Sequence, residues 1–334
     1  MKRILKMLGL VFLGLTLVAG GLTLFDQSNS SASAATKVKT SKKVSGVDKD
    51  TLVVDMPAAD HGWLSGVAYY AQQECKALHL KKYRVITAAN VNDQTSQLNE
   101  LTNQKVGAIV LEPYTGELSV AARKVVKANI PLVIFDRKVN ANYNGFVAGS
   151  NTEIGKTSAD YLGSKLNGKG TIAVLSVPSS GSVSSERVGG FKKEMKAKYP
   201  NIKLVTMTAD AFTQKDGLQT GQDMLTAHKH VDAIYSIDDE SSMGILQAIK
   251  EAKRTDVKYL SGCGGSQAYL KKIKNNKDSI KLFTATYSPT MMRIAVREAN
   301  SAMHGKKIPK NKIIKTNIVT KSNVNKFMDS NSPY

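Results

Sequence analysis

The sequence predicts an α/β protein with two lobes, each a doubly wound parallel sheet covered by helices, joined by a hinge. Three observations lead to this fold class. The chain has 334 residues, more than the roughly 100–200 residues of one ordinary domain. From Thr51 onward, short β-type runs alternate with longer segments at helical spacing, which is typical of βαβ units in parallel sheets. Residues 149–152 interrupt this alternation midway, as a crossing between lobes would.

The expected strands fall into two series, one on each side of the interruption. The first series comprises residues 51–56, 83–87, 108–111, 132–135 and 146–148. The second comprises residues 171–177, 203–207, 233–237, 258–260 and 281–285. Amphipathic helices fill the gaps, for example at residues 63–78 and 152–166. A single barrel of eight β/α units in ~250 residues is the alternative architecture, and the interruption favours two lobes.

The start of the chain carries the pattern of an export signal. Lys2, Arg3 and Lys6 precede an uncharged run over residues 7–25, and small residues at 32–35 resemble a cleavage site. The run is also about long enough to span a bilayer, so residues 1–34 are a signal peptide or an uncleaved anchor. No cysteine lies directly after the run, which excludes a lipid anchor there. We expect an exported protein at the cell surface or outside the cell, or in the periplasm if the source has an outer membrane.

These features set the expected domain boundaries. Residues 35–50 are rich in Ser, Ala and Lys and form a linker. Lobe 1 comprises residues 51–149 plus 288–318, lobe 2 comprises residues 150–287, and residues 319–334 form a C-terminal segment.

Composition excludes several classes of function. The net charge of +20 invites a nucleic-acid partner, but the lysines are scattered through helices and loops and no binding motif accompanies them, so we expect none. Cys75 and Cys263 lack metal-type spacing; a disulfide between them stays open, and two small buried residues are the simpler interpretation. The sequence has no nucleophile elbow, P-loop or zinc-protease motif. We therefore predict no catalysis, no cofactor and no metal.

Charged and aromatic residues gather where the expected strands end. Ligands of open parallel sheets bind beyond these carboxyl ends. Simpler roles exist for some members: Asp239 or Glu240 would cap the next helix, Trp63 would be core, and His61 would be a surface residue. The candidate set is Trp63 and His61 at a helix entry, Glu112, Asp136, Arg137, Asp238, Gly264 and Tyr287 after strands, and Arg187 in a helix.

Three stretches resemble one known family. They are residues 130–137, residues 185–191, and 238–240 followed by Met243 and Gly244. From Thr51 to Phe327 the chain resembles the periplasmic sugar-binding proteins of the ribose-binding type, which are related to the ligand domains of LacI-type repressors. The resemblance implies the type I periplasmic binding protein fold and a sugar held between two lobes.

The resemblance also implies roles for individual residues. Asp136 and Arg137 grip sugar hydroxyls, Arg187 and Phe212 contribute from lobe 2, Trp63 stacks on the sugar ring, and His61 precedes it. Several positions depart from the family. Leu64 replaces a second stacking ring, Glu112 and Asp238 replace asparagines, Tyr287 takes a hinge-side glutamine position, and Gly264 stands where ribose binders carry an aspartate.

Together these features predict a solute-binding protein that captures a monosaccharide or polyol for an ABC importer. Three acids and two arginines give the expected site a net charge of minus one, which suits a neutral or weakly cationic ligand. The expected partners are permease subunits; the protein is expected to be monomeric and close to the membrane. The alternative is an extracellular sugar sensor for a receptor kinase. A repressor is excluded by the export signal, and a hydrolase is disfavoured by the missing nucleophile machinery.

Overall fold

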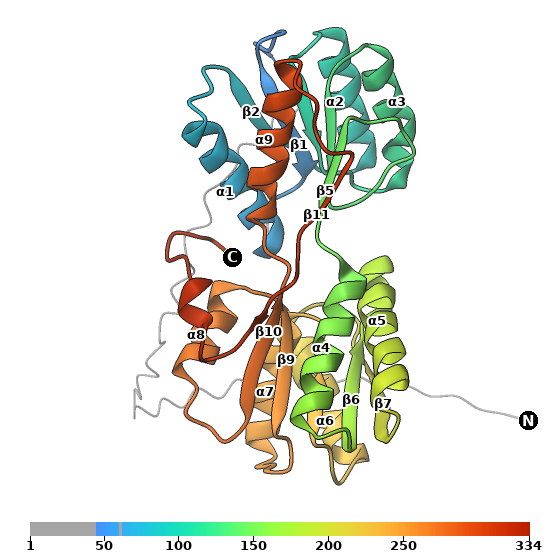
Figure 1. Ribbon diagram of the computed structural model, residues 1–334, viewed down its shortest axis with the longest axis vertical. Coiled ribbons are helices and arrows are strands. Elements are labelled where there is room, and N and C mark those ends of the chain that lie inside the picture. Colours follow the sequence, from blue (N-terminus) through green and yellow to red (C-terminus); the bar gives the residue numbers. More distant parts are fainter. Residues whose placement is uncertain (1–44, 60–61) are drawn as a thin grey trace, which may run out of the picture. The chain divides into compact units, whose positions relative to one another are not determined.

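The computed structural model describes residues 45–59 and 62–334. They form two α/β lobes, each built on a six-stranded sheet (Figure 1), and the predicted fold class is confirmed. The expected signal peptide, the linker up to residue 44, and His61 lie outside the described residues. Within the described ranges, no helix has the length and apolar character needed to cross a bilayer.

The first sheet has the strand order β11-β5-β4-β3-β1-β2, and every pairing in it is parallel. All residues of β1, β3, β4 and β5 are buried, as expected for strands covered on both faces. Its strands are β1 (Leu52–Pro57), β2 (Tyr83–Ala88), β3 (Ala108–Leu111), β4 (Leu132–Phe135), β5 (Gly145–Ala148) and β11 (Asn311–Ile313). Its helical elements are α1 (Gly62–Ala77), α2 (Val91–Asn103), η1 (Gly116–Leu118), α3 (Ser119–Lys127) and α9 (Met291–Met303).

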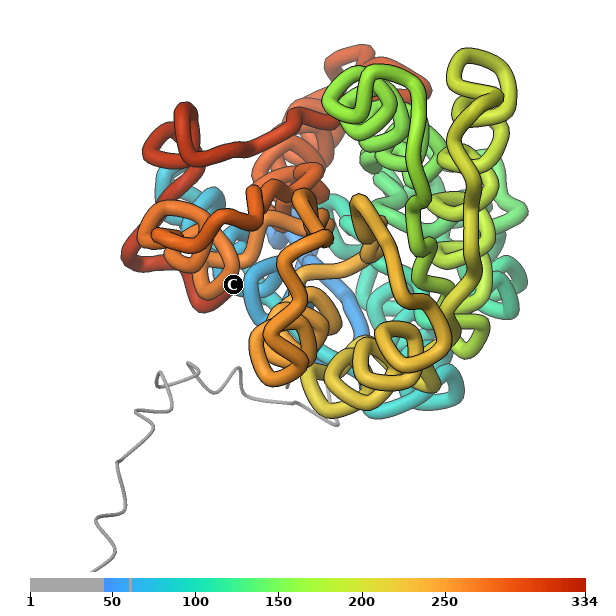
Figure 2. The backbone as a smooth tube through the Cα atoms, turned by 90° about the horizontal axis from the view of Figure 1, so that it is seen from below, coloured from blue at the N-terminus to red at the C-terminus, as the bar shows by residue number. Residues whose placement is uncertain are grey.

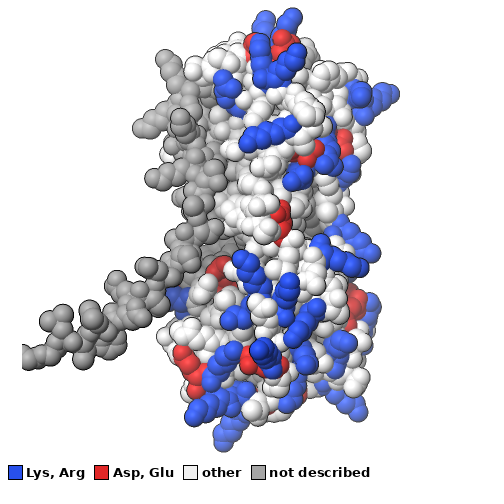
Figure 3. Space-filling model, turned by 90° about the vertical axis from the view of Figure 1, so that its left-hand side faces the viewer, with Lys and Arg blue, Asp and Glu red and all other residues white. Residues whose placement is uncertain are grey.

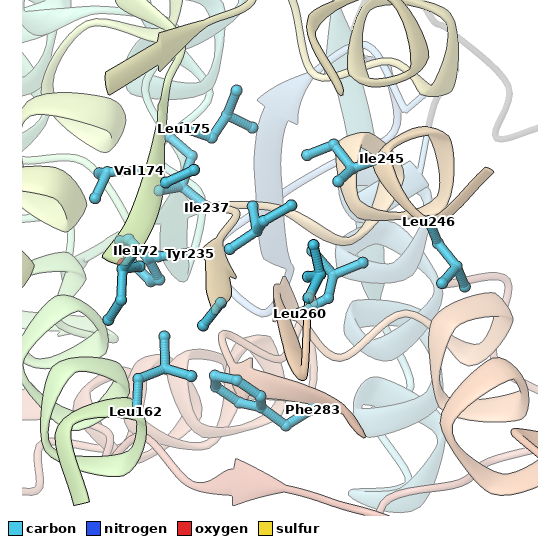
Figure 4. Packing of buried hydrophobic residues seen from close by; sticks show 14 of the residues in the cluster. Leu162, Ile172, Val174, Leu175, Tyr235, Ile237, Ile245, Leu246, Leu260 and Phe283 are labelled. Atoms are coloured by element: carbon cyan, nitrogen blue, oxygen red, sulfur yellow. The ribbon is translucent and has the colours of Figure 1, made fainter. Parts of the chain in front are cut away.

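The second sheet has the order β12-β10-β9-β8-β6-β7 and is parallel except for β12, which runs antiparallel to β10. Apolar side chains from its strands and helices meet in one cluster (Figure 4). Its strands are β6 (Gly170–Ser176), β7 (Ile202–Thr208), β8 (Ala233–Tyr235), β9 (Tyr259–Gly264), β10 (Lys281–Thr286) and β12 (Ile318–Val319). Its helical elements are α4 (Asn151–Lys165), η2 (Pro178–Ser180), α5 (Ser182–Lys198), α6 (Gln214–Ala227), α7 (Asp239–Glu251), α8 (Gln267–Asn275) and η3 (Val324–Lys326).

The described chain passes between the sheets at three places. It crosses from β5 to α4, returns from β10 to α9, and crosses again from β11 to β12 (Figure 1). Each sheet therefore contains strands from distant parts of the sequence. These connections position the carboxyl ends of both sets of parallel strands, where the candidate site residues lie.

Eight of the ten expected strands agree with the structure to within one residue at each end; the larger differences are at β8 and β9, and β11 and β12 were not expected. β11 and β12 were not predicted because three and two residues are too few to show a period. β8 ends at Tyr235 rather than residue 237, because the Ser236 N–H donates to the Ser261 hydroxyl instead of a strand. β9 continues to Gly264 rather than ending at residue 260. Gly262 and Gly264 pair with residues of β10. Asp239 and Tyr269 occupy the space that a side chain at position 262 would need.

The excess positive charge is dispersed on the face shown in Figure 3. Lys and Arg side chains cover both lobes there, with acidic side chains between them. A dispersed charge of this kind is typical of a solvated surface.

Candidate functional site

Tyr287 lies at the centre of the candidate site and contacts residues from both lobes. Its hydroxyl donates a hydrogen bond to the Asp136 carboxylate, and the Arg187 guanidinium carbon lies 5.3 Å from its ring centroid. The Trp63 indole Nε1 donates to the Tyr287 carbonyl at 2.8 Å, and the two rings are 5.7 Å apart. Burial and the Asp136 charge raise the pKa of Tyr287 well above its usual value, so the phenol stays neutral.

Arg187 lies in α5, and two hydrogen bonds from its guanidinium fix its side chain in the site. Its side chain is buried. The guanidinium Nε donates to Asn151 Oδ1 at 2.9 Å, and Nη1 donates to the Ile237 carbonyl at 2.7 Å. These two bonds fix the plane of the guanidinium, so its orientation is set before a ligand arrives.

Asp136 directly follows β4 in a conformation that is uncommon for a residue with a side chain. Its φ is +62°, in the left-handed region that Asp and Asn tolerate best. The Arg137 Nε lies 3.6 Å from Asp136 Oδ2, and Arg137 Nη1 donates to the Tyr114 carbonyl at 2.8 Å. Arg137 is about half exposed, so this arginine reaches toward solvent while Asp136 faces Tyr287.

Glu112 is a fully buried acid whose carboxylate lacks hydrogen-bond partners. It follows β3, and neither of its oxygens has a partner within the described chain. Burial, followed by the charge of Asp136, raises the pKa of Glu112 well above its usual value. A buried polar group without a hydrogen bond lowers the stability of the folded state. A hydroxyl placed beside the Glu112 carboxyl would supply the missing hydrogen bond.

Asp238 plays a capping role and also keeps one oxygen free. Its Oδ1 accepts from the Ser241 N–H at 2.8 Å as the N-cap of α7, while Oδ2 has no partner in the described residues. Burial raises the pKa of Asp238 to about 6. The cap of this helix is therefore Asp238 rather than the expected Asp239 or Glu240.

Asp239 instead organises the end of β9. Its carboxylate accepts from the N–H groups of Gly265 and Ser266, at 2.8 and 2.6 Å, and from the Thr284 hydroxyl at 2.7 Å. These hydrogen bonds stabilise the turn between β9 and α8, so the role of Asp239 is structural.

The remaining aromatic candidates differ in position. Trp63 stacks on Phe135 with ring centroids 6.0 Å apart and an interplanar angle of 11°, so it contacts both the lobe 1 core and Tyr287. Phe212 packs against the core of lobe 2. Leu64 is buried in the lobe 1 core. The structure thus brings Trp63 to the other candidates and places Leu64 in a core. Phe212 is only partly buried against the core of lobe 2, and its contact with a ligand stays a prediction.

Sequence reasoning missed Asp55 and Gln94, which support the first-lobe side of the site. Asp55 lies in β1, and burial raises its pKa to about 8. Gln94 Nε2 donates to Asp55 Oδ1 at 3.0 Å and to the Glu112 carbonyl at 2.9 Å, while its Oε1 accepts from the Tyr114 N–H at 2.8 Å. An acid inside an otherwise apolar strand was the signal that could have identified Asp55.

Gly264 is buried at the end of β9 with a φ of +129°, a region that disfavours any side chain. A Cβ at this position would overlap the hydroxyl oxygen of Tyr334 and lie 3.2 Å from its Cζ. Sequence reasoning missed Tyr334 because nothing in the C-terminal segment indicates where its side chains point.

A cavity of about 370 Å³ adjoins Gly264. It is lined by Tyr70 of α1, Thr286 of β10 and Arg293 of α9, together with residues of the crossings and of the C-terminal segment, among them Gly149 and Tyr334. Of the predicted site residues described in the structure, only Gly264 lines this cavity, so the space lies beside the cluster around Tyr287.

The two cysteines are separate and unreactive in character. Cys75 and Cys263 are both free and buried, and burial raises the pKa of each thiol to about 12. The disulfide that the sequence left open is not formed.

Comparison with known proteins agrees with this architecture. A family model described as a periplasmic binding protein domain matches residues 52–307. The ribose import binding protein of Bacillus subtilis is 26% identical over 242 residues, which cover 72% of this chain and 77% of that protein. The xylitol-binding protein of Mycolicibacterium smegmatis is 27% identical over 189 residues, covering 56% of this chain and 54% of that protein.

Solved structures show the same fold. A solute-binding protein from Actinobacillus succinogenes with bound D-allose has a TM-score of 0.73 and 20% identity, over 83% of this chain and 99% of that one. A second, from Bacillus halodurans with bound myo-inositol, has a TM-score of 0.72 and 20% identity, over 85% and 99%.

Proposed function

The chain belongs to the periplasmic binding protein domain family, and from this premise we propose that it captures a monosaccharide or related polyol between its lobes for an ABC importer. Similar proteins bear the names of import binding proteins for ribose and D-apiose, which supports the importer role over that of a sensor for a receptor kinase. The family consists of binding proteins, and we propose binding without catalysis.

The unpaired acids carry this proposal. Among the described residues, two oxygens of Glu112 and one of Asp238 have no hydrogen-bond partner. Both acids are buried; the charge of Asp136 acts on Glu112, and that of Arg187 acts on Asp238. A sugar hydroxyl is both a donor and an acceptor, so it satisfies a carboxylate and a guanidinium in turn. Hydrogen bonds to a charged group such as the Arg187 guanidinium contribute about 1.5–3 kcal/mol each, and those to a neutral carboxyl contribute less. A polyhydroxy ligand with a neutral or weakly cationic character therefore suits the set of acids and arginines.

We propose that the ligand is enclosed by closure of two lobes about the crossings. The expected boundaries are residues 51–149 plus 288–318 for lobe 1, residues 150–287 for lobe 2 and residues 319–334 for the C-terminal segment. Ile318 and Val319 pair with β10 as β12, so these two residues belong to the second sheet. Asp136 belongs to lobe 1 and Arg187 to lobe 2, so a ligand that contacts both is held only when the lobes approach. Hinge closure of this kind excludes water from the bound ligand.

The same function accounts for the expected location and partners. An importer component must meet its ligand outside the cytoplasm, as the pattern at Lys2, Arg3 and Lys6 predicts. We propose that the exported monomer then docks on permease subunits at the membrane.

A thermal-shift screen tests the function. The panel is D-ribose, D-allose, xylitol, myo-inositol and D-glucosamine, each added to the purified chain from residue 35 onward. A ligand at 100 times its dissociation constant stabilises the folded state by about 2.7 kcal/mol, so a true ligand raises the melting temperature clearly. Absence of a shift with every sugar and polyol, followed by absence of binding in calorimetry, would show that the function is wrong.

A further inference from the structure

The side chain of Tyr334 lies between the two lobes, against glycines of both. In lobe 1, a Cβ at Gly66 would lie 2.9 Å from Tyr334 Cβ, and one at Gly62 would lie 3.8 Å from its Cδ2. In lobe 2, a Cβ at Gly264 would overlap the Tyr334 hydroxyl oxygen. The phenol therefore extends from α1 to the end of β9, and its hydroxyl takes the place of a side chain at position 264.

The C-terminal segment that carries Tyr334 is anchored to both lobes. Asp329 Oδ2 accepts from the Tyr70 hydroxyl of α1 at 2.9 Å, and the Asp329 N–H donates to Gln267 Oε1 of α8, also at 2.9 Å. Phe327 and Met328 pack against the lobe 2 core. Figures 1 and 2 show this red segment beside α8. The segment thus has fixed partners that hold Tyr334 at a defined position.

The Tyr334 hydroxyl reaches the edge of the candidate site at Gly264. Asp239 Oδ2 would lie 3.4 Å from a Cβ at Gly264. Tyr287, the residue directly after β10, donates its N–H to the Gly264 carbonyl at 3.0 Å. Burial raises the pKa of Tyr334 well above its usual value, and Arg187 and Asp238 are among the groups whose charges act on it. The phenol is thus neutral, and its hydroxyl both donates and accepts.

We propose that Tyr334 is a specificity-determining residue of the ligand site, with its hydroxyl supplying the polar contact that Gly264 cannot. This inference rests on the proposed function. A neutral hydroxyl donates to a ligand oxygen as well as accepting from it, whereas an ionised carboxylate at the same place only accepts. The ring also occupies volume that a larger ligand would need. Tyr334 therefore selects both the hydrogen-bonding pattern and the size of the bound sugar or polyol.

Two variants separate these contributions. Tyr334→Phe keeps the ring and removes the hydroxyl, and we expect it to weaken binding of the tightest panel ligand about threefold to tenfold. Tyr334→Ala removes the ring as well, and we expect a larger loss together with a changed order of preference among the panel compounds. Tyr143→Phe, on a loop of lobe 1, is the matched control and should leave affinity unchanged.

Calorimetric titration of the wild type and the three variants with the five compounds tests the inference. Weaker binding by both Tyr334 variants with a changed ligand order supports it. The inference is overturned if both Tyr334 variants bind the panel compounds as tightly as the wild type does. It is also overturned if Tyr334→Ala binds them more tightly with the same order of preference. In either case the proposed function stands. Binding of no compound by the wild type overturns the proposed function, and the inference with it. The melting temperatures of the ligand-free variants show whether any loss reflects unfolding.

Discussion

The hydroxyl of Tyr287 donates a hydrogen bond to the carboxylate of Asp136, which joins the end of β10 in one sheet to the end of β4 in the other. The same ring lies against Arg187. We therefore expect a ligand that enters here to compete with the Tyr287 hydroxyl for the Asp136 carboxylate.

Asp136→Asn should reduce ligand affinity while the protein stays folded. Asn tolerates the left-handed conformation of this position, but it exchanges one charged acceptor for a neutral donor. We expect affinity to fall roughly tenfold to a hundredfold, the range of a lost charge-assisted hydrogen bond. Calorimetry with the tightest ligand measures the loss, and Asp160→Asn, on the surface of α4, is the control. Equal affinities for Asp136→Asn and the wild type would remove Asp136 from the site.

The ligand-free protein should lose stability as the pH rises from about 4 to about 8. Burial raises the pKa of Asp55 from 3.8 to about 8 in the folded state. Between these values the folded protein binds more protons than the unfolded chain, so the free energy of unfolding decreases with pH. Urea denaturation at pH 5 and pH 8 measures this difference. Asp55→Asn should reduce it, whereas the exposed control Asp223→Asn should not; an unchanged slope in Asp55→Asn would contradict the assignment.

Gly264→Ala should destabilise the protein through backbone strain and overlap with Tyr334. A φ of +129° costs a residue with a Cβ roughly 1–3 kcal/mol, and displacement of the Tyr334 hydroxyl adds to this. The double variant Gly264→Ala/Tyr334→Ala should recover the part due to overlap, which a double-mutant cycle in urea isolates. Gly189→Ala, where a Cβ meets nothing within 4 Å, should be neutral or stabilising. Strictly additive effects would show that the two positions are independent.

The chain should be found outside the cytoplasm. N-terminal sequencing of native material should give Ala35 or a neighbouring residue first, or else an intact N-terminus held in the membrane, because Lys2, Arg3 and Lys6 precede an uncharged run. A protein recovered from the cytoplasm with Met1 at its start would refute export.

Ribose should not be the best ligand. The resemblance places Gly264 where ribose binders carry an aspartate, and places the acids Glu112 and Asp238 where they carry asparagines. At position 264 the neutral Tyr334 hydroxyl stands in place of a carboxylate, so the hydrogen-bonding pattern differs from that of a ribose binder. Two mismatched hydrogen bonds would cost about 1–3 kcal/mol each, so another sugar, amino sugar or polyol should bind at least about tenfold more tightly. Titration of the panel against ribose measures this ratio. Low-micromolar ribose binding that no other compound matches would show that these three positions were misinterpreted.

Local patterns were enough to predict most of the fold. Strands β3 and β4 agree with the expected ranges, because four consecutive apolar residues that include Val and Ile at each place favour a short buried strand. The helices around residues 63–78 and 152–166 begin and end one residue earlier than expected. β11 and β12 escaped prediction because pairing with β5 and β10, rather than local preference, makes them strands.

The candidate site was less predictable, because its geometry depends on contacts between distant residues. The position of Asp136 after β4 was predictable from the sequence, yet its partner Tyr287 follows a strand of the other sheet, 151 residues away in sequence. The absence of a side chain at Gly264 was visible as well. That Tyr334 occupies the resulting space follows only from the path of the C-terminal segment.

The repeated crossings determine the order in which the lobes are completed during synthesis. The first sheet contains β11, which pairs with β5, and α9 packs against β3, β4 and β5. Residues 291–313 are therefore needed before lobe 1 has all of its strands and covering helices, although β1 emerges from the ribosome early. Until residues 291–313 have been made, β3, β4 and β5 lack the helix that packs against them and β5 lacks its neighbour β11, so the core of the first lobe is completed only late in synthesis.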